Sequence, residues 1–186
     1  MGHQQIKELF FENPHREFYL RQVARLTKTP KTTAAAALKQ LIKEKLAIRK
    51  KDEPFDKYCA NVPDSIYSFY KTYFILEKIH KSGLIDYIVE NTHPRVIILF
   101  GSCAKGEYDT TSDIDLFIQA PEVKLDFERF KLNQKINPVF NKEIININPD
   151  LRWNILNGIK IYGLVRYDKA LGLCDVRKRA LEKSRK

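Results

Sequence analysis

The feature that most constrains the fold is a polar segment enclosed by two apolar runs. The runs are Val96–Phe100 and Leu116–Ile118, and short apolar runs of this kind are typical of buried strands. Neither approaches the length of about 20 apolar residues that a membrane span needs. The polar segment contains Gly101 and Gly106, and a glycine that leaves a strand permits a tight turn and close backbone approach. The pattern predicts two buried strands joined through a polar turn.

Two carboxylates, Asp113 and Asp115, stand at the start of the second run. Alternate residues of a strand face the same side, so both carboxylates should project together, about 7 Å apart. Their charges repel each other, and a divalent cation removes that repulsion. Hard oxygen ligands suit Mg²⁺, which binds through one or two carboxylates together with substrate phosphates. We expect two Mg²⁺ ions, since paired metals about 3.5–4 Å apart clamp an attacking and a leaving oxygen.

The turn after the first run contains groups that fit an anion. Gly101 allows close backbone approach, and Ser102 can begin a short helix whose free N–H groups and hydroxyl face a phosphate. Lys105 adds a positive charge nearby. Together with the carboxylates, these groups predict a triphosphate held between the turn and bound metal.

The sequence thus contains one spaced pattern: Gly-Ser, ten intervening residues and then Asp-x-Asp. This pattern resembles the motif of the DNA polymerase beta nucleotidyltransferase superfamily, most closely that of the minimal nucleotidyltransferase group. Gly106 and Ser112 also match. The resemblance covers about residues 94–165. Its later elements would be a helix at 126–134, a third strand at 143–148, a helix at 151–157 and a strand at 158–163.

The resemblance implies the roles of individual residues. Asp113 and Asp115 would bind Mg²⁺, and the family's third carboxylate, on the third strand, would be Glu143, as metal ligand or general base. The implied reaction transfers a nucleoside monophosphate from an NTP, with ATP as first candidate, to an acceptor hydroxyl. Minimal members resemble antitoxins that add AMP to a partner toxin, so the acceptor is a protein of that kind or a nucleic acid.

The first 52 residues are strongly basic, with 12 Lys and Arg against 5 acids, in a chain of net charge +10. Such a module attracts polyanions. Hydrophobic periodicity predicts helices at 4–11 and 20–26, a third from Thr32 or Thr33 to about Glu44, and strands at 46–51 and 58–62.

This order of elements resembles a winged helix-turn-helix over the first 62 residues. The resemblance implies nucleic-acid contacts from the third helix and the wing. The matching residues are Thr32, Thr33, Lys39, Gln40, Lys43, Arg49, Lys50 and Lys51. Because Ala35 and Ala36 share the exposed face of the third helix, base-reading side chains are scarce. We therefore expect weak sequence specificity, or a winged helix that is used for protein contact.

We therefore predict an α+β protein in which a winged helix, a helical connector and a nucleotidyltransferase domain follow one another. The nucleotidyltransferase domain should contain a small mixed β-sheet flanked by helices. The predicted boundaries are 1–62, 63–92 and 93–170, followed by a basic tail at 171–186. The connector should form helices at 66–80 and 84–90, whose aromatic residues pack against both domains or a second chain.

Three hypotheses of function remain. The first is the Mg²⁺-dependent nucleotidyltransferase, and an inactive homologue is its variant. The second is a DNA-binding transcriptional regulator whose nucleotidyltransferase domain senses nucleotide or is inactive, and the third is a scaffold for protein partners. Three scattered cysteines and four histidines show neither disulfide nor zinc spacing. The N-terminus has no apolar signal segment, so we expect a cytoplasmic protein without a membrane partner, and a homodimer stays open.

Overall fold

The computed structural model describes residues 2–166, which form two compact units. The first unit contains residues up to Ile75 together with Gly106–Ser112, and the second contains Leu76–Lys105 and the chain from Asp113 onward. The division falls inside the helix α4 (Ser65–Lys81), which thus contributes to both units. Within the described range, every helix is too short or too polar to cross a membrane. The predicted basic tail at 171–186 lies outside the described residues.

The first unit combines three helices with a three-stranded antiparallel sheet of order β1-β3-β2. Its elements are α1 (Gly2–Glu12), β1 (Phe18–Tyr19), α2 (Leu20–Leu26), α3 (Lys31–Lys43), β2 (Ala47–Lys50) and β3 (Lys57–Ala60). All the helices and strands predicted in this region are therefore present. The start of α3 is corrected, because Pro30 rather than Thr32 or Thr33 occupies the cap position. Proline is favoured near a helix start because its fixed φ suits the first turn and no N–H is lost there.

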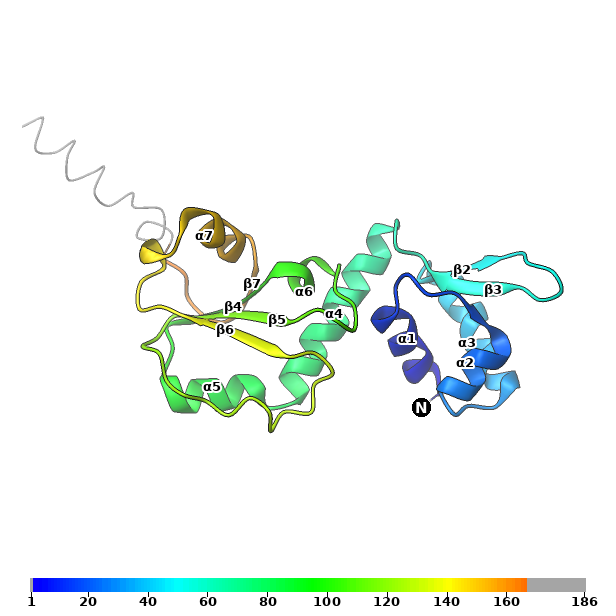
Figure 1. The fold of residues 1–186 in the computed structure, drawn as a ribbon, viewed down its shortest axis with the longest axis horizontal. Coiled ribbons are helices and arrows are strands. Elements are labelled where there is room, and N and C mark those ends of the chain that lie inside the picture. The colour runs from blue at the N-terminus through cyan, green and yellow to red at the C-terminus, as the bar shows by residue number, and fades with distance from the viewer. Residues whose placement is uncertain (1, 167–186) are drawn as a thin grey trace, which may run out of the picture. The chain divides into compact units, whose positions relative to one another are not determined.

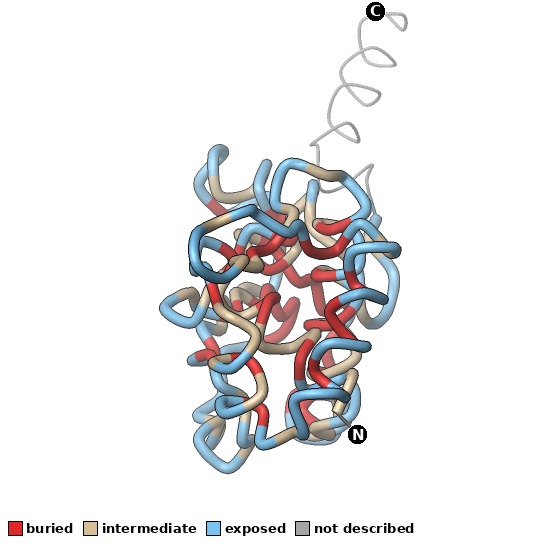
Figure 2. Tube along the Cα trace, turned by 90° about the vertical axis from the view of Figure 1, so that its right-hand side faces the viewer, coloured by how far each residue is buried: buried red, intermediate tan, exposed pale blue. Residues whose placement is uncertain are grey.

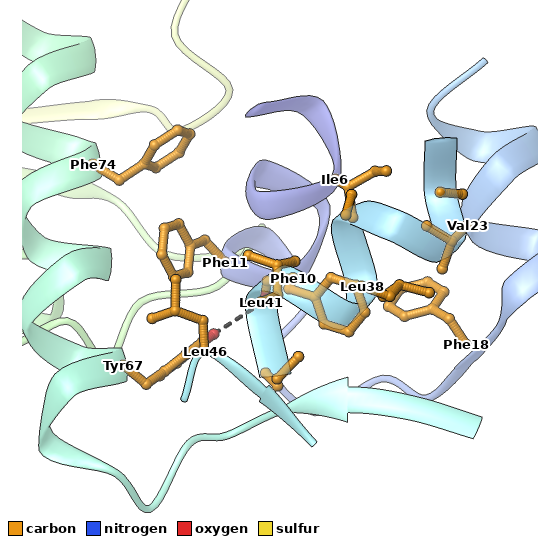
Figure 3. Close-up of a cluster of buried hydrophobic side chains, with 14 residues drawn as sticks. Ile6, Phe10, Phe11, Phe18, Val23, Leu38, Leu41, Leu46, Tyr67 and Phe74 are labelled. Atoms are coloured by element: carbon orange, nitrogen blue, oxygen red, sulfur yellow. Dashed lines mark hydrogen bonds between the residues drawn. The ribbon is translucent and has the colours of Figure 1, made fainter. Parts of the chain in front are cut away.

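Aromatic and aliphatic side chains fill the core of the first unit (Figure 3). It joins α1, α2 and α3 to the first half of α4 (Ser65–Lys81), through Ile6, Phe10, Phe11, Phe18, Val23, Leu38, Leu41, Leu46, Tyr67 and Phe74. Burial of each such side chain contributes about 1.5–3 kcal/mol to the stability of the folded state. The buried Tyr67 hydroxyl donates a hydrogen bond to the Phe10 carbonyl at 3.0 Å, and burial raises the pKa of Tyr67. Helix α4 is thereby fixed to α1.

The segment Gly106–Ser112 is anchored on α4. The ammonium of Lys71, which is buried, donates to the carbonyl of Tyr108, and the Tyr108 hydroxyl donates back to the Lys71 carbonyl at 3.2 Å. Gly106, with φ of 71°, lies so close to the Ser68 carbonyl that a Cβ atom would overlap it. The polar turn of the motif is therefore packed rather than loose.

The second unit is built on a four-stranded mixed sheet of order β6-β5-β4-β7 (Figure 1). Its elements are α5 (Leu84–Thr92), β4 (Val96–Phe100), α6 (Gly101–Lys105), β5 (Ile114–Ile118), β6 (Ile136–Phe140), the 3-10 turn η1 (Ile144–Asn146), α7 (Pro149–Leu156) and β7 (Ile159–Gly163). Strand β4 pairs antiparallel with β5 and β7, whereas β5 and β6 are parallel. The predicted small mixed sheet flanked by helices is confirmed.

Helices cover both faces of this sheet, with α5 on one side and α7 on the other (Figure 1). Strand β4 is buried along its whole length, as the continuous apolar sequence predicts. Val96, Ile98 and Phe100 alternate onto one face, where they meet Phe117 of β5 and Ile155 of α7. Figure 2 colours the Cα trace by burial, with buried residues in red and exposed residues in pale blue.

The predicted third strand at 143–148 is wrong, because the strand beside β5 is β6, at 136–140. The later segment holds η1 instead. There, the Asn141 side chain accepts from the Glu143 N–H at 3.0 Å and the Asn148 side chain caps α7 at 2.9 Å. Such local side-chain bonds compete with the pairing of a strand.

The predicted helix at 126–134 is also wrong. The chain there forms successive turns, beginning where the Asp126 carboxylate accepts from the Glu128 N–H at 3.2 Å. The next backbone bonds join Phe130 to Phe127 and Leu132 to Phe130, which are not helical i to i−4 spacings. The predicted final helix and strand are confirmed as α7 and β7.

Candidate active site

The site is centred on the contact between the turn at Gly101 and the carboxylate of Asp115. Asp115 is the second residue of β5 and lies opposite Phe100, the last residue of β4. Gly101 follows with φ of 72°, and a Cβ atom there would overlap the Asp115 Oδ2 atom. Only glycine combines this backbone conformation with room for the carboxylate. The structure therefore brings Gly101 and Asp115 together, as the motif predicts.

Asp113 stands immediately before β5 rather than within it, with its side chain exposed. Its backbone position is fixed from two sides. The thiol of buried Cys103, in α6, donates to the Asp113 carbonyl at 3.3 Å, and the Ile114 N–H donates to the Lys135 carbonyl at 2.7 Å. Helix α6 is thus attached directly to the carboxylate-bearing segment.

Ser102 and Lys105 both lie on α6, which confirms the short helix expected after the turn. Ser102 is half-buried in its first turn, and Lys105 is the exposed last residue. The glycine turn, the serine, the lysine and the two aspartates therefore belong to one segment folded around the ends of β4 and β5.

Glu143 does not join this group. Strand β6 runs parallel to β5, with Ile118 opposite Phe140, so residues after Phe140 lie near the far end of β5. The Gln119 side chain donates to the Lys142 carbonyl at 3.1 Å. Glu143 lines a small hollow there with Arg95. Gln119 is four residues beyond Asp115, about 13 Å along the strand. The prediction that Glu143 converges with Asp113 and Asp115 is corrected.

The residue that does occupy the neighbouring position is Asn137. It lies directly opposite Asp115 on β6, and its Nδ2 donates to the Asp115 Oδ1 at 2.8 Å. Sequence reasoning missed Asn137 because it placed the third strand too late. A usable signal was present in Ile136–Phe140, since proline in a strand indicates an edge strand, and β6 is an edge of this sheet.

The donor set fits one magnesium ion and does not fit a pair. Two carboxylates from one short segment are the kind and number of protein ligands that Mg²⁺ takes alongside substrate phosphates. Across residues 2–166, no three His, Cys, Asp or Glu side chains come together as a metal-binding group. The third side chain at this point is the neutral amide of Asn137. The expected second ion therefore lacks an acidic ligand among the described residues.

The predicted nucleic-acid contacts lie on the exposed surface of the first unit. All are exposed: Thr32, Thr33, Lys39, Gln40 and Lys43 on α3, Arg49 and Lys50 on β2, and Lys51 directly after it. A shallow hollow between α3 and the β2–β3 hairpin is lined by Lys39 and Arg49 among others. Ala35 and Ala36 are exposed as well, as the periodicity predicts.

Acidic residues partly neutralise the hairpin. Arg49 pairs with Asp56, and Lys50 pairs with Glu17 at 2.6 Å. The hydrogen bond to Glu17 raises the pKa of Lys50, and the same bond lowers the pKa of Glu17. Lys39, Lys43 and Lys51 take part in no ion pair found within the described part of the chain. Among the predicted contact residues, the lysines outside these ion pairs therefore lie on α3 and directly after β2.

A family model matches most of the second unit. Residues 82–166 match the family model described as Polymerase beta, Nucleotidyltransferase. This range contains α5, the whole mixed sheet, the Gly101 turn and both aspartates. The match indicates a nucleotidyltransferase domain and, in general terms, nucleotidyl transfer. No curated protein and no solved structure matches the chain.

Proposed function

We propose that residues 82–166 bind a nucleoside triphosphate, with ATP as the first candidate, as its magnesium complex. The domain would transfer the nucleoside monophosphate to an acceptor hydroxyl, with cleavage of the α–β phosphoanhydride bond and release of pyrophosphate. The observation that carries the proposal is the contact between Gly101 and Asp115 within a domain that matches the nucleotidyltransferase family. That contact joins the turn suited to phosphate with the carboxylate suited to metal.

The residues of the chain have distinct roles in this proposal. Asp113 and Asp115 hold the cation, the Gly101 backbone lets the phosphates approach, and Ser102 and Lys105 contact phosphate oxygens. Magnesium, when bound, compensates the charge of the phosphates and of both carboxylates. Phosphoryl transfer asks little of a protein beyond positioning and electrostatic stabilisation. The chain supplies both from the ends of β4 and β5.

Calorimetry of the full chain with a non-hydrolysable ATP analogue tests binding. We expect binding with Mg²⁺ and its loss in EDTA. Asp113→Asn and Asp115→Asn should each weaken binding about tenfold or more, because each removes a charged ligand. The matched control is Glu90→Gln, which removes an exposed acid from α5 on the other face of the sheet. Equal affinity in the aspartate variants and the control would reject this site.

The acceptor is either a nucleic acid or a protein, including a toxin partner of the kind modified by antitoxins. Incubation of a cell lysate with α-labelled NTPs and Mg²⁺, followed by separate RNA and protein gels, identifies it. Label should enter one class of macromolecule with the wild-type chain and not with Asp113→Asn. Absence of label from both classes would reject transfer while leaving nucleotide binding to the calorimetric test.

We also propose that the first unit is a winged helix that binds duplex DNA through α3 and the β2–β3 hairpin. The exposed lysines Lys39, Lys43 and Lys51 support contacts to phosphates, which position a protein without reading sequence. Affinity for duplex DNA should therefore fall steeply with salt. In a plot of the logarithm of the binding constant against the logarithm of the salt concentration, neutralising these three lysines should reduce the magnitude of the slope by about three. A slope unchanged by the triple substitution would reject this interface.

A second candidate function is a DNA-binding regulator that senses nucleotide without turning it over. The observation that favours it is the neutral Asn137 beside Asp115, where an acid is needed for a third charged ligand. In that case DNA affinity of the full chain should change when Mg²⁺ and the ATP analogue are added. Label transfer from NTP to any lysate component decides for the enzyme.

A further inference from the structure

The carboxylate of Asp115 has a neighbour on each side. Oδ1 accepts the hydrogen bond from Asn137 at 2.8 Å, and Oδ2 lies against the Gly101 backbone. The atom of Asn137 that faces Asp115 is the amide nitrogen, a donor that matches an acceptor oxygen of the carboxylate. Asn137 is therefore oriented with its donor toward Asp115. It holds that side chain in one position against the turn.

This pairing follows from the sheet register. Strands β5 and β6 are parallel, and Asp115 and Asn137 are direct partners, so their side chains project from the same face. Phe100 of β4 is the partner of Asp115 on the other side. A row across three strands thus places Asn137, Asp115 and the residue before Gly101 next to one another, at the end of the sheet where the proposed nucleotide site lies.

The charge of the site comes from Asp115 in this row and from Asp113, which directly precedes β5. Asp113 and Asp115 supply two negative charges, and Asn137 supplies none, although its side chain has nearly the size of an aspartate. Glu143, the acid expected in this role, lies at the other end of β5. Two carboxylates suffice for one divalent cation with a nucleotide, whereas a second cation beside the first needs further negative charge.

We infer that Asn137 is a positioning residue that restricts this site to a single divalent cation by presenting an amide donor to Asp115. The inference rests on the proposed binding of a metal–nucleotide complex and specifies its stoichiometry. An acid at 137 would replace the hydrogen bond with repulsion between two carboxylates. That repulsion would be relieved by a second cation, so residue 137 sets the number of ions.

The experiment counts Mn²⁺, as a magnetic substitute for Mg²⁺, bound to the full chain in the presence of the non-hydrolysable ATP analogue. Equilibrium dialysis with electron paramagnetic resonance gives ions per chain. We expect one ion in the wild type and two in Asn137→Asp. Asn137→Ala, which removes the donor without adding charge, should keep one ion with affinity reduced by about threefold to tenfold, since a hydrogen bond to a charged group is lost.

Thermal unfolding supplies a readout independent of catalysis. In EDTA, Asn137→Asp should melt below the wild type, and Mn²⁺ should raise its melting temperature more than that of the wild type. In Asn137→Ala, Mn²⁺ should raise the melting temperature no more than in the wild type. A merely structural role of residue 137 would not predict this difference between the two variants. If Asn137→Asp does not fold, two measurements still test the inference: the number of Mn²⁺ ions bound per wild-type chain and the affinity of Asn137→Ala for Mn²⁺.

The outcomes separate the inference from the proposed function. Two ions in the wild type, or one ion in a folded Asn137→Asp, would overturn the role of Asn137 while leaving the metal–nucleotide site in place. Undiminished affinity in Asn137→Ala would also overturn it. If the wild type binds neither Mn²⁺ nor the analogue, the proposed function fails and the inference fails with it.

Discussion

Gly101→Ala tests the contact on which the site depends. Gly101 has φ of 72°, a left-handed conformation that costs a residue with a Cβ about 1–2 kcal/mol. The new methyl group would also overlap the Asp115 Oδ2 atom, so either the carboxylate or the turn must move. Moving the carboxylate breaks its bond to Asn137, which at a partly exposed site is worth about 1 kcal/mol. We expect a total loss of about 2–3 kcal/mol in the free energy of unfolding.

Gly83→Ala provides the matched control. Gly83 has nearly the same backbone conformation, with φ of 76°, but apart from its own local backbone no described atom lies within 4 Å of the position a Cβ would take. Urea denaturation should show only the conformational cost of about 1–2 kcal/mol in this variant. Calorimetry should show unchanged binding of the Mg²⁺–ATP analogue in Gly83→Ala and loss of about tenfold or more in Gly101→Ala, because the displaced Asp115 is a metal ligand. Equal stability and equal affinity in the two variants would refute the reasoning.

Two further predictions concern the first unit. Tyr67→Phe leaves the Phe10 carbonyl without its buried donor, so urea denaturation should show a loss of about 1–3 kcal/mol, and a loss near zero would contradict the role of that bond. Hydrogen bonds from Thr111 and Ser112 lower the pKa of Asp109, so its contribution to stability is present above the unfolded pKa of about 3.9 and is lost as pH falls through the folded value. Thermal melts should therefore decline less between about pH 5 and pH 3 in Asp109→Asn than in the wild type, and parallel curves would reject this assignment.

The N-terminal helices were predictable because hydrophobic periodicity there agrees with packing. Ala34, Ala37, Leu38 and Leu41 recur at helical spacing and all point into the core of the first unit. The strand at Val96–Phe100 was equally clear, since a short continuous apolar run has few alternatives to a buried strand. The glycine turn and the short helix after it followed from the same stretch of sequence.

The third strand was not predictable by the same rules. Ile136–Phe140 contains Pro138, which argues against a central strand but is compatible with an edge strand, and β6 is an edge of the sheet. Residues 143–148 are rich in isoleucine and imitate a strand, but asparagine side chains turn the chain there. Because the third strand was predicted several residues too late, Glu143 rather than Asn137 was assigned to the site. The error lay in long-range pairing, which local sequence does not encode.

Anomalous diffraction tests the central claim most directly. Crystals of the full chain grown with Mn²⁺ and a non-hydrolysable ATP analogue should show one manganese peak within ligand distance of Asp113 and Asp115, with the triphosphate against the turn at Gly101. No manganese beside these two carboxylates, or manganese bound at Glu143 instead, would contradict the site proposed for this protein.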